Sequence, residues 1–293
     1  MSLALFIETF GIWAGVSCVL VLGLIIGSFL NVVIYRLPRM LQREWRNECL
    51  EFLQQHPEKT GQETFNLILP GSQCPQCHST LKFWHNIPLL SYLFLWGKCQ
   101  FCRQPISFQY PVVELMTALA SAFLFWHFTS HGVRDPLYLL AVLGFTWLLV
   151  GMLVIDLYHQ ILPDSLTLLL LWLGLLLSVY GGSVTAETAI IGATVGYSSL
   201  WLITAIFKLI TGKQGMGHGD FKLFAALGAW LGWQPLPLVL LFASGVGAII
   251  GISLIIFNKQ NRGQPIPFGP YLAIAGWLAL ILGDQTTAWL IRI

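Results

Sequence analysis

The residues of this chain most suited to chemistry are a few carboxylates and four cysteines set beside apolar sequence. Asp156 ends one apolar run, and Asp220 closes the glycine-rich segment 215–220 (GMGHGD) directly before another. A carboxylate inside or at the edge of a hydrophobic helix is costly, so it is a functional candidate by default. The cysteines form two C-x-x-C pairs, a spacing that suits metal binding. Acid–base catalysis and a metal site are therefore the two chemistries to consider.

Asp156 and Asp220 form a candidate aspartic protease pair. Two carboxylates that meet where the dielectric is low cannot both ionise easily, so they share a proton. One can take a proton from an attacking water while the other donates to a peptide carbonyl oxygen. The three glycines of segment 215–220 allow unusual backbone dihedrals and the close approach of a substrate strand. The alternative is that Asp220 caps its helix and Asp156 is a polar helix end; the residues alone leave both open.

Two further carboxylates have simpler explanations. Asp164 follows Leu162 and Pro163 at the start of an apolar run, and we expect it to be the N-cap of that helix. Glu114 follows Pro111 near another helix start, where a carboxylate is favoured by the positive end of the helix dipole. For Glu114, helix capping and a role near the chemistry both remain open.

Two C-x-x-C pairs predict a zinc site. They are separated by 21 residues and comprise Cys74, Cys77, Cys99 and Cys102. Two such pairs complete a tetrahedral four-sulfur site with no open coordination position, so the zinc is expected to be structural. Two disulfides or a redox pair are the alternatives, and a reducing cytosol disfavours the disulfides.

The other possible metal ligands are weaker candidates. His78 and His85 lie near the cysteine pairs, but four cysteines already complete a site, so we interpret both as surface residues. Cys18 and Cys49 stand alone and are interpreted as packing or surface residues.

The elements that carry these residues belong to a membrane protein. Of 293 residues, 56% are hydrophobic and only 10% are charged, which is more apolar surface than one soluble core would bury. Segment 10–35 is uncharged and long enough to cross the bilayer. Glu8 is the only charge before Arg36, whereas a cleaved signal peptide has a basic start. We therefore expect a retained first span with its amino end outside.

Basic residues then set the orientation. Arg36, Arg39, Arg43 and Arg46 follow the first span at once, which places the next segment in the cytoplasm. We expect three parts: a first transmembrane helix (1–35), a cytosolic zinc-binding domain (36–110) and a transmembrane aspartyl peptidase domain (111–293). The middle part lacks a long apolar segment, so its metal is expected to supply much of its folding free energy.

The predicted fold is an all-α polytopic membrane protein with about eight transmembrane helices. Segment 221–232 is too short to span alone. If it crosses, however, Lys259 and Arg262 fall on the cytoplasmic side with most other basic residues, which favours eight crossings. Asp156 and Asp220 then both lie near the cytoplasmic face. After the first span, helices are expected at 111–130, 136–156, 163–181, 186–209, 221–232, 237–257 and 268–290.

At this point a family resemblance becomes visible. Segment 217–220 (GHGD), together with Asp156 and segment 162–164 (LPD), resembles the GxGD class of membrane aspartyl proteases. Within that class the chain is similar to the bacterial type IV prepilin leader peptidases, through the four cysteines, segment 27–38 (GSFLNVVIYRLP) and segment 267–270 (PFGP).

The resemblance implies two activities in the bacterial inner membrane. The first is cleavage of the leader from prepilins or pseudopilins at the cytoplasmic face, with Asp156 and Asp220 as the catalytic pair. The second is N-methylation of the new amino-terminal residue from S-adenosylmethionine. Gly97, Lys98 and Glu114 are candidate contacts for donor or substrate; the alternatives are a turn, a surface charge and a helix cap. No glycine-rich nucleotide-binding turn supports the second activity from the residues themselves.

Other functions remain to be weighed. A transporter or metal sensor would also have carboxylates within the membrane, with the cysteines as a regulatory zinc site. A peptidase without methyltransferase activity is a third hypothesis, against which the four-cysteine domain argues. The net charge of +2 is small and dispersed, so lipid and pilin precursors are the expected partners and nucleic acid is not.

Overall fold

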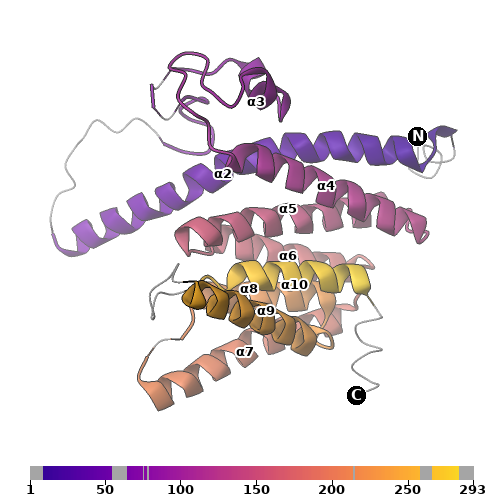
Figure 1. Ribbon diagram of the computed structural model, residues 1–293. Helices are drawn as coiled ribbons and strands as arrows, with labels where there is room; N and C mark the ends of the chain where they lie inside the picture. The colour runs from indigo at the N-terminus through magenta and orange to yellow at the C-terminus, as the bar shows by residue number, and fades with distance from the viewer. Residues whose placement is uncertain are drawn as a thin grey trace. The chain divides into compact units, whose positions relative to one another are not determined.

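The described part of the chain is helical. The computed structural model describes residues 9–54, 65–74, 76–77, 79–213, 215–257 and 266–283. Within these ranges all regular elements are helices, and the only strand-like pairings are two isolated bridges (Figure 1). The chain divides into two compact units, Met1–Arg134 and Asp135–Ile293. The predicted all-α class is confirmed, whereas the division into 1–35, 36–110 and 111–293 stays a prediction.

The N-terminal unit is built on two packed helices. α2 (Ile12–Phe52) lies against α4 (Gln109–Ser130), and the segment between them holds the short helices η1 (Phe83–Asn86) and α3 (Leu90–Phe94). Gly27 permits the close approach, because a Cβ there would lie 2.7 Å from the Glu114 Cα. Helices in lipid associate through such small residues, since no hydrophobic effect drives them together.

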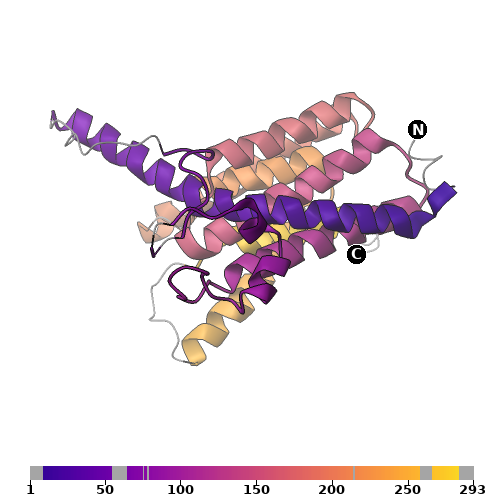
Figure 2. The same ribbon diagram turned by 90° about the horizontal axis from the view of Figure 1, so that it is seen from above.

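α2 is longer than its apolar part. The end of the apolar run at residue 35 suggests an end to the helix, yet the helix continues to Phe52 and contains Pro38. Segment 39–52 holds no glycine and is rich in Leu, Arg, Glu and Gln, which favour helix. Pro38 has no N–H to donate to the Ile34 carbonyl, which is the usual cause of a helix bend. The ribbon of α2 changes direction along its length in both views (Figures 1 and 2).

The C-terminal unit surrounds one short helix. α8 touches α6, α7, α9 and α10, and every residue from 220 to 230 except Lys222 is buried. With 14 residues and about 1.5 Å of rise per residue, it is shorter than the roughly 30 Å hydrocarbon core. A helix of this length cannot cross the hydrocarbon core by itself, and α8 is instead enclosed by the other helices of its unit. The helices of this unit are α5 (Pro136–His159), α6 (Asp164–Val179), α7 (Ala186–Thr211), α8 (His218–Leu231), α9 (Leu236–Ile256) and α10 (Gly269–Leu282).

Glycines let α7 and α8 come into backbone contact. A Cβ on Gly192 would meet the Gly228 carbonyl, and a Cβ on Gly228 would meet that of Gly192. One turn further along, Gly196 faces the Phe224 carbonyl, which a Cβ would approach to 2.6 Å. The two backbones touch over two turns, so α8 has a fixed position along α7.

Lipid must cover much of the surface. Large apolar side chains point outward from several helices: Trp172 on α6 is 60% exposed and Ile249 on α9 is 67% exposed. The described helices that are long and apolar enough to cross a membrane are α2, α4, α5, α7 and segment Leu236–Leu254 of α9, while α6 and α10 are apolar but shorter. The chain is therefore an integral membrane protein. The number of crossings stays a prediction, and the expected helix 268–290 is described only to residue 283.

Candidate active site and metal centre

The structure brings Asp156 and Asp220 to one cavity. Asp156 lies in the last turn of α5 and Asp220 in the first turn of α8, and they are 5% and 9% exposed. Both line a cavity of about 540 Å³, close enough for the charge of one to act on the other. Segments 64 residues apart in the chain are thus joined at two helix ends, as the protease hypothesis requires.

Asp156 is held by a backbone amide. Its Oδ2 accepts a hydrogen bond from the Gly269 N–H at 3.0 Å. A Cβ on Gly269 would lie 2.6 Å from this oxygen and 3.0 Å from Leu162 Cδ1, so the position requires glycine. Gly269 was part of the family resemblance only, and its local signal is a glycine and a proline at the start of an apolar run. The amide of α10 therefore fixes the orientation of the Asp156 carboxylate.

Asp220 is a first-turn residue and not the cap. The N-cap of α8 is Gly217, in extended backbone, and the helix begins at His218. Asp220 is therefore not the N-cap residue, although its carboxylate accepts a hydrogen bond from the Gly217 backbone amide, which is a capping interaction. A carboxylate in the first turn is favoured by the helix dipole. Gly219 brings the turn against Leu162, since a Cβ there would lie 2.7 Å from the Leu162 Cβ. The glycine-rich segment thus packs closely on its own unit.

The remaining wall of this cavity comes from three loops. Gln160 ends α5 in the left-handed region with φ of 53°, and its N–H donates to the Asp156 carbonyl. Met216 contributes from the glycine-rich segment, and Pro267 and Phe268 precede α10. The two acids therefore face a space whose borders are both polar and apolar.

Asp164 has a different environment from the one predicted. Pro163 is the N-cap of α6, so the N-cap prediction is wrong. Both Asp164 oxygens instead accept from Lys222 Nζ at 2.7 Å. The Asp164 side chain is 60% exposed, and such surface pairs contribute only about 0–1 kcal/mol. Asp164 does not line the cavity, which leaves Asp156 as the partner of Asp220.

The four cysteines converge on one point. Their sulfurs all lie within 4.8 Å of one another, and the Cys74 and Cys102 sulfurs are 3.8 Å apart. A disulfide would need about 2.05 Å, and the described cysteines are free. Four sulfurs placed at about 2.3 Å around a tetrahedral zinc are about 3.8 Å from each other. The donor set and its spacing therefore fit zinc.

The two cysteine pairs sit in equivalent backbone turns. The first is closed by the bridge between Gln73 and Thr80, and the second by the bridge between Lys98 and Pro105. In each, the first cysteine donates its N–H to a carbonyl five residues later, at 3.0 Å for Cys74 and 2.9 Å for Cys99. The chain thus presents the two pairs of sulfurs by the same local hydrogen bonding.

The surroundings of the cysteine cluster shift the pKa values of three of its thiols. Hydrogen bonds with the Ser79 side chain and backbone lower the pKa of Cys77 to about 6. The backbone amides of Cys102 and Phe101 lower the pKa of Cys99. For Cys102, a backbone hydrogen bond with Gln104 lowers the pKa, but burial and the neighbouring cysteines outweigh it and raise the value to about 11. Full ionisation of the cluster therefore calls for a positive charge at its centre.

The three predicted donor contacts have different surroundings in the structure. Glu114 lies in the second turn of α4, 8% exposed, and its Oε2 accepts from the Leu89 N–H at 2.8 Å, so the helix-cap interpretation is wrong. Gly97 is a buried turn residue with φ of 65°, packed on Tyr92, and Lys98 is exposed. Roles for all three in donor binding stay predictions. His78 and the side chain of His85 lie outside the described residues.

Comparison with known proteins agrees with this arrangement. Residues 21–128 match the bacterial peptidase A24 N-terminal domain. Residues 142–252, which include both aspartates, match the type IV leader peptidase family. The chain belongs to this family. The two matched regions fall in the two compact units.

Relatives in the family are similar over nearly the whole chain. The prepilin leader peptidase/N-methyltransferase of Stutzerimonas stutzeri is 53% identical, over 94% of this chain and 93% of the relative. Proteins of the same name from Pseudomonas aeruginosa and Neisseria gonorrhoeae are 52% and 45% identical, over 94% and 90% of this chain and 92% and 90% of their own. No solved structure matches the chain significantly.

The close contact between Gly269 and the Asp156 carboxylate predicts how a substitution at Gly269 changes stability. Gly269→Ala should destabilise the protein by about 1–3 kcal/mol, because the added methyl overpacks the Asp156 carboxylate and Leu162. Gly144→Ala is the matched control, since a Cβ at Gly144 meets nothing within 4 Å. Thermal unfolding of the purified protein in detergent should show a lower melting temperature for Gly269→Ala only. Equal melting temperatures for both variants would contradict the described contact.

Proposed function

We propose that this chain is a membrane aspartic endopeptidase that cleaves the leader peptide from type IV prepilins or pseudopilins and then N-methylates the new amino-terminal residue. The observation that carries the proposal is the burial of Asp156 and Asp220 in one cavity at two helix ends. The names of the relatives, prepilin leader peptidase/N-methyltransferase, support both activities.

Hydrolysis follows from two carboxylates in different settings. Asp156 is oriented by the Gly269 amide, and Asp220 lies at the positive end of α8. With one proton shared by the pair, the ionised member takes a proton from water as the water attacks the peptide carbonyl. The protonated member donates to the carbonyl oxygen, and the pair then protonates the leaving amine. No covalent intermediate with the protein is formed.

The cavity borders suit a backbone substrate. Gly215 and Gly217 add no side chains to the wall, and a Cβ at Gly217 would be 3.8 Å from Asp220 Oδ2. An extended peptide can therefore bring its carbonyl group close to the acids. Met216 and Phe268 add apolar side chains to the same wall.

The four cysteines are proposed to bind a structural zinc ion. Cys74, Cys77, Cys99 and Cys102 supply four sulfurs and complete its coordination, so the ion has no open position for catalysis. Its contribution is to tie together two turns of a segment with only short helices of its own.

S-Adenosylmethionine is proposed as the methyl donor, through the name of the relatives. When bound, it supplies an electrophilic methyl group to the new amine. Among the three candidate contacts, Glu114 offers a buried carboxylate to a positively charged group, and this chemistry fits the donor's cationic end. Gly97 and Lys98 lie beside Cys99, next to the second cysteine pair.

We place the protein in the bacterial inner membrane, with its amino end outside and both sites on the cytoplasmic side. The four arginines that follow the apolar part of α2 support this orientation. Prepilins or pseudopilins and lipid are the proposed partners. A transporter or sensor remains the alternative, and it predicts no cleavage activity in detergent.

Loss of either acid should abolish cleavage. Asp156→Asn and Asp220→Asn should each slow trimming of a synthetic prepilin by at least about 100-fold, because an amide can neither accept nor donate the proton that general acid–base catalysis requires. Asp164→Asn is the matched control and should retain activity, since Asp164 lies outside the cavity. Product formation by the detergent-solubilised protein is followed by gel shift.

Melting temperatures close to that of the wild type would show that the aspartate variants are folded. Wild-type rates in both Asp156→Asn and Asp220→Asn would rule out the aspartyl mechanism, and no cleavage by the wild type would favour the transporter.

The metal proposal predicts a zinc stoichiometry. The purified protein should contain about one zinc per chain, as a closed four-sulfur site requires. Cys74→Ser should lose it, whereas Cys49→Ser, an exposed cysteine on α2, should keep it. Elemental mass spectrometry of the purified variants measures the content. Unchanged zinc in Cys74→Ser would exclude this site.

Methyl transfer should be visible in the product and separable from cleavage. With S-adenosylmethionine present, the cleaved pilin should gain one methyl group on its amino-terminal residue. Because Asp220 lies in the C-terminal unit and the candidate donor contacts lie in the N-terminal unit, Asp220→Asn should still methylate a pre-cleaved pilin peptide. Mass spectrometry reads both results. An unmethylated product at saturating donor would leave a peptidase without methyltransferase activity.

A further inference from the structure

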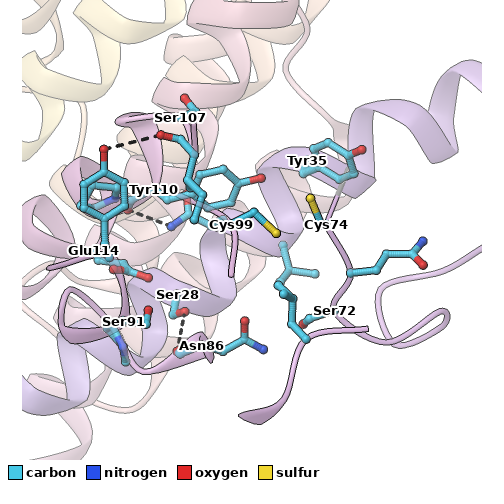
Figure 3. A pocket seen from close by; sticks show the side chains of 18 of the residues that line it. Ser28, Tyr35, Ser72, Cys74, Asn86, Ser91, Cys99, Ser107, Tyr110 and Glu114 are labelled. Atoms are coloured by element: carbon cyan, nitrogen blue, oxygen red, sulfur yellow. Dashed lines mark hydrogen bonds between the residues drawn. The ribbon is translucent and has the colours of Figure 1, made fainter. Parts of the chain in front are cut away.

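A second and larger cavity lies within the N-terminal unit. Its volume is about 820 Å³, and it is bordered by α2, by the start of α4 and by the segments that carry the cysteines (Figure 3). This volume is in the range of small-molecule sites, about 300–1,000 Å³. The peptidase pair belongs to the other unit, so the peptidase mechanism does not account for the cavity.

One wall of this cavity has an unsatisfied buried acceptor. Asn31 on α2 is 4% exposed, and its Nδ2 donates to the Tyr110 carbonyl at 3.0 Å. Its Oδ1 is the one buried side-chain N or O atom without a hydrogen-bond partner in the described part of the chain. An unpaired buried acceptor costs free energy, and a ligand that donates to it would offset that cost. Asn31 is also the only amide side chain in the apolar segment 10–35.

Glu114 adds negative charge to the same cavity. It is 8% exposed, and one oxygen accepts from the Leu89 N–H. The salt bridge between Lys222 and Asp164 lies elsewhere, in the C-terminal unit. Arg36 also borders the cavity, but its guanidinium donates to backbone carbonyls of segment 66–71. The Asn31 and Glu114 side of the cavity therefore favours a positively charged ligand group.

The rest of the wall has a different character. The Gln73, Gln100 and Gln104 side chains offer both donors and acceptors, which suit the edge of a heterocycle and the hydroxyls of a sugar. The rings of Tyr35 and Phe65 also border the cavity, and the guanidiniums of Arg39 and Arg43 lie over them. In Figure 3, Glu114 lies toward one side of the view, whereas Tyr35 and Cys74 lie toward the other. The cavity thus combines a carboxylate with an amide-rich wall.

We propose that this cavity is the binding site for S-adenosylmethionine, with Asn31 Oδ1 and the Glu114 carboxylate holding the cationic end of the donor. The nucleoside then lies along the amide-rich wall. This assignment rests on the methyltransferase activity proposed above. In the transfer, an N–C bond forms to the neutral substrate amine as the C–S bond breaks, the electron pair stays on sulfur as a thioether, and the amine releases one proton to water.

The test is donor binding by the full-length protein in detergent, measured by equilibrium dialysis with labelled S-adenosylmethionine. Glu114→Gln keeps an acceptor for the Leu89 amide but removes the charge, and it should weaken donor binding by at least about tenfold. Asn31→Leu should do the same. Asn31→Asp keeps an oxygen acceptor while it loses the donation to Tyr110, so it should bind the donor near the wild-type affinity.

Exposed residues of α2 outside the cavity supply the controls. Asn47→Leu and Glu48→Gln repeat the same chemical changes at positions that do not line the cavity, and both should bind the donor as the wild type does. Zinc content and melting temperature confirm that each variant is folded.

The outcomes separate this inference from the proposed function. Wild-type donor affinity in both Asn31→Leu and Glu114→Gln overturns the inference. Equal losses in Asn31→Asp and Asn31→Leu show a structural role for the Tyr110 contact and overturn the assignment of Asn31. Unchanged donor affinity with a raised KM for a peptide that begins with phenylalanine makes this the substrate amine site instead. Prepilin cleavage without any donor binding by the wild type removes the methyltransferase proposal itself.

Discussion

The constraint that organises this protein is that lipid offers no hydrogen bonds to the backbone. Each spanning segment must satisfy its own N–H and C=O groups, so the apolar segments are helical. Free backbone amides and polar side chains are then left mainly at helix ends. The candidate active site is built from three such ends: Asp156 closes α5, Asp220 opens α8, and the first residue of α10, Gly269, donates its amide to Asp156. The two candidate catalytic carboxylates are thereby positioned by helices, and the loops between the helices form the walls.

The segment that carries the four cysteines is not ordered by long apolar helices. Its described residues form only the short helices η1 and α3, and it has too little apolar sequence for a core, so it needs another source of order. Two turns with equivalent hydrogen bonds aim two sulfurs each at one point, and a cation at that point would connect segments 22 residues apart. The same segment closes the larger cavity over α2 and α4. The proposed metal site is thus coupled to the shape of the proposed donor site, and a four-sulfur zinc site has no open position for chemistry.

The sequence predicted what depends on composition and short spacing: the apolar helices, the four-cysteine cluster and the placement of Asp156 and Asp220 at helix ends. It did not predict contacts that backbone groups make across long separations. Every residue but proline has an N–H, so nothing local marks that of Gly269 as the partner of Asp156, 113 residues away. The local sequence predicts that Asp164 is an N-cap, since its actual partner, Lys222, is 58 residues away and leaves no local signal. The sequence did not predict that α2 continues past Pro38, because a proline followed by charged residues is also typical of a helix end. The residues that follow nevertheless favour helix.

The glycine contact between α7 and α8 restricts which parts of this enzyme can accept substitutions. Gly192 and Gly228 hold the two backbones in touch, so the helix that carries Asp220 has no freedom to move outward for a bulkier substrate. The walls made by Met216 and by Pro267 and Phe268 have no such restriction, since they belong to connections between helices. An engineer who wants a different cleavage specificity should diversify Met216 and segment 266–268 and leave Gly215, Gly217 and the α7 and α8 glycines untouched.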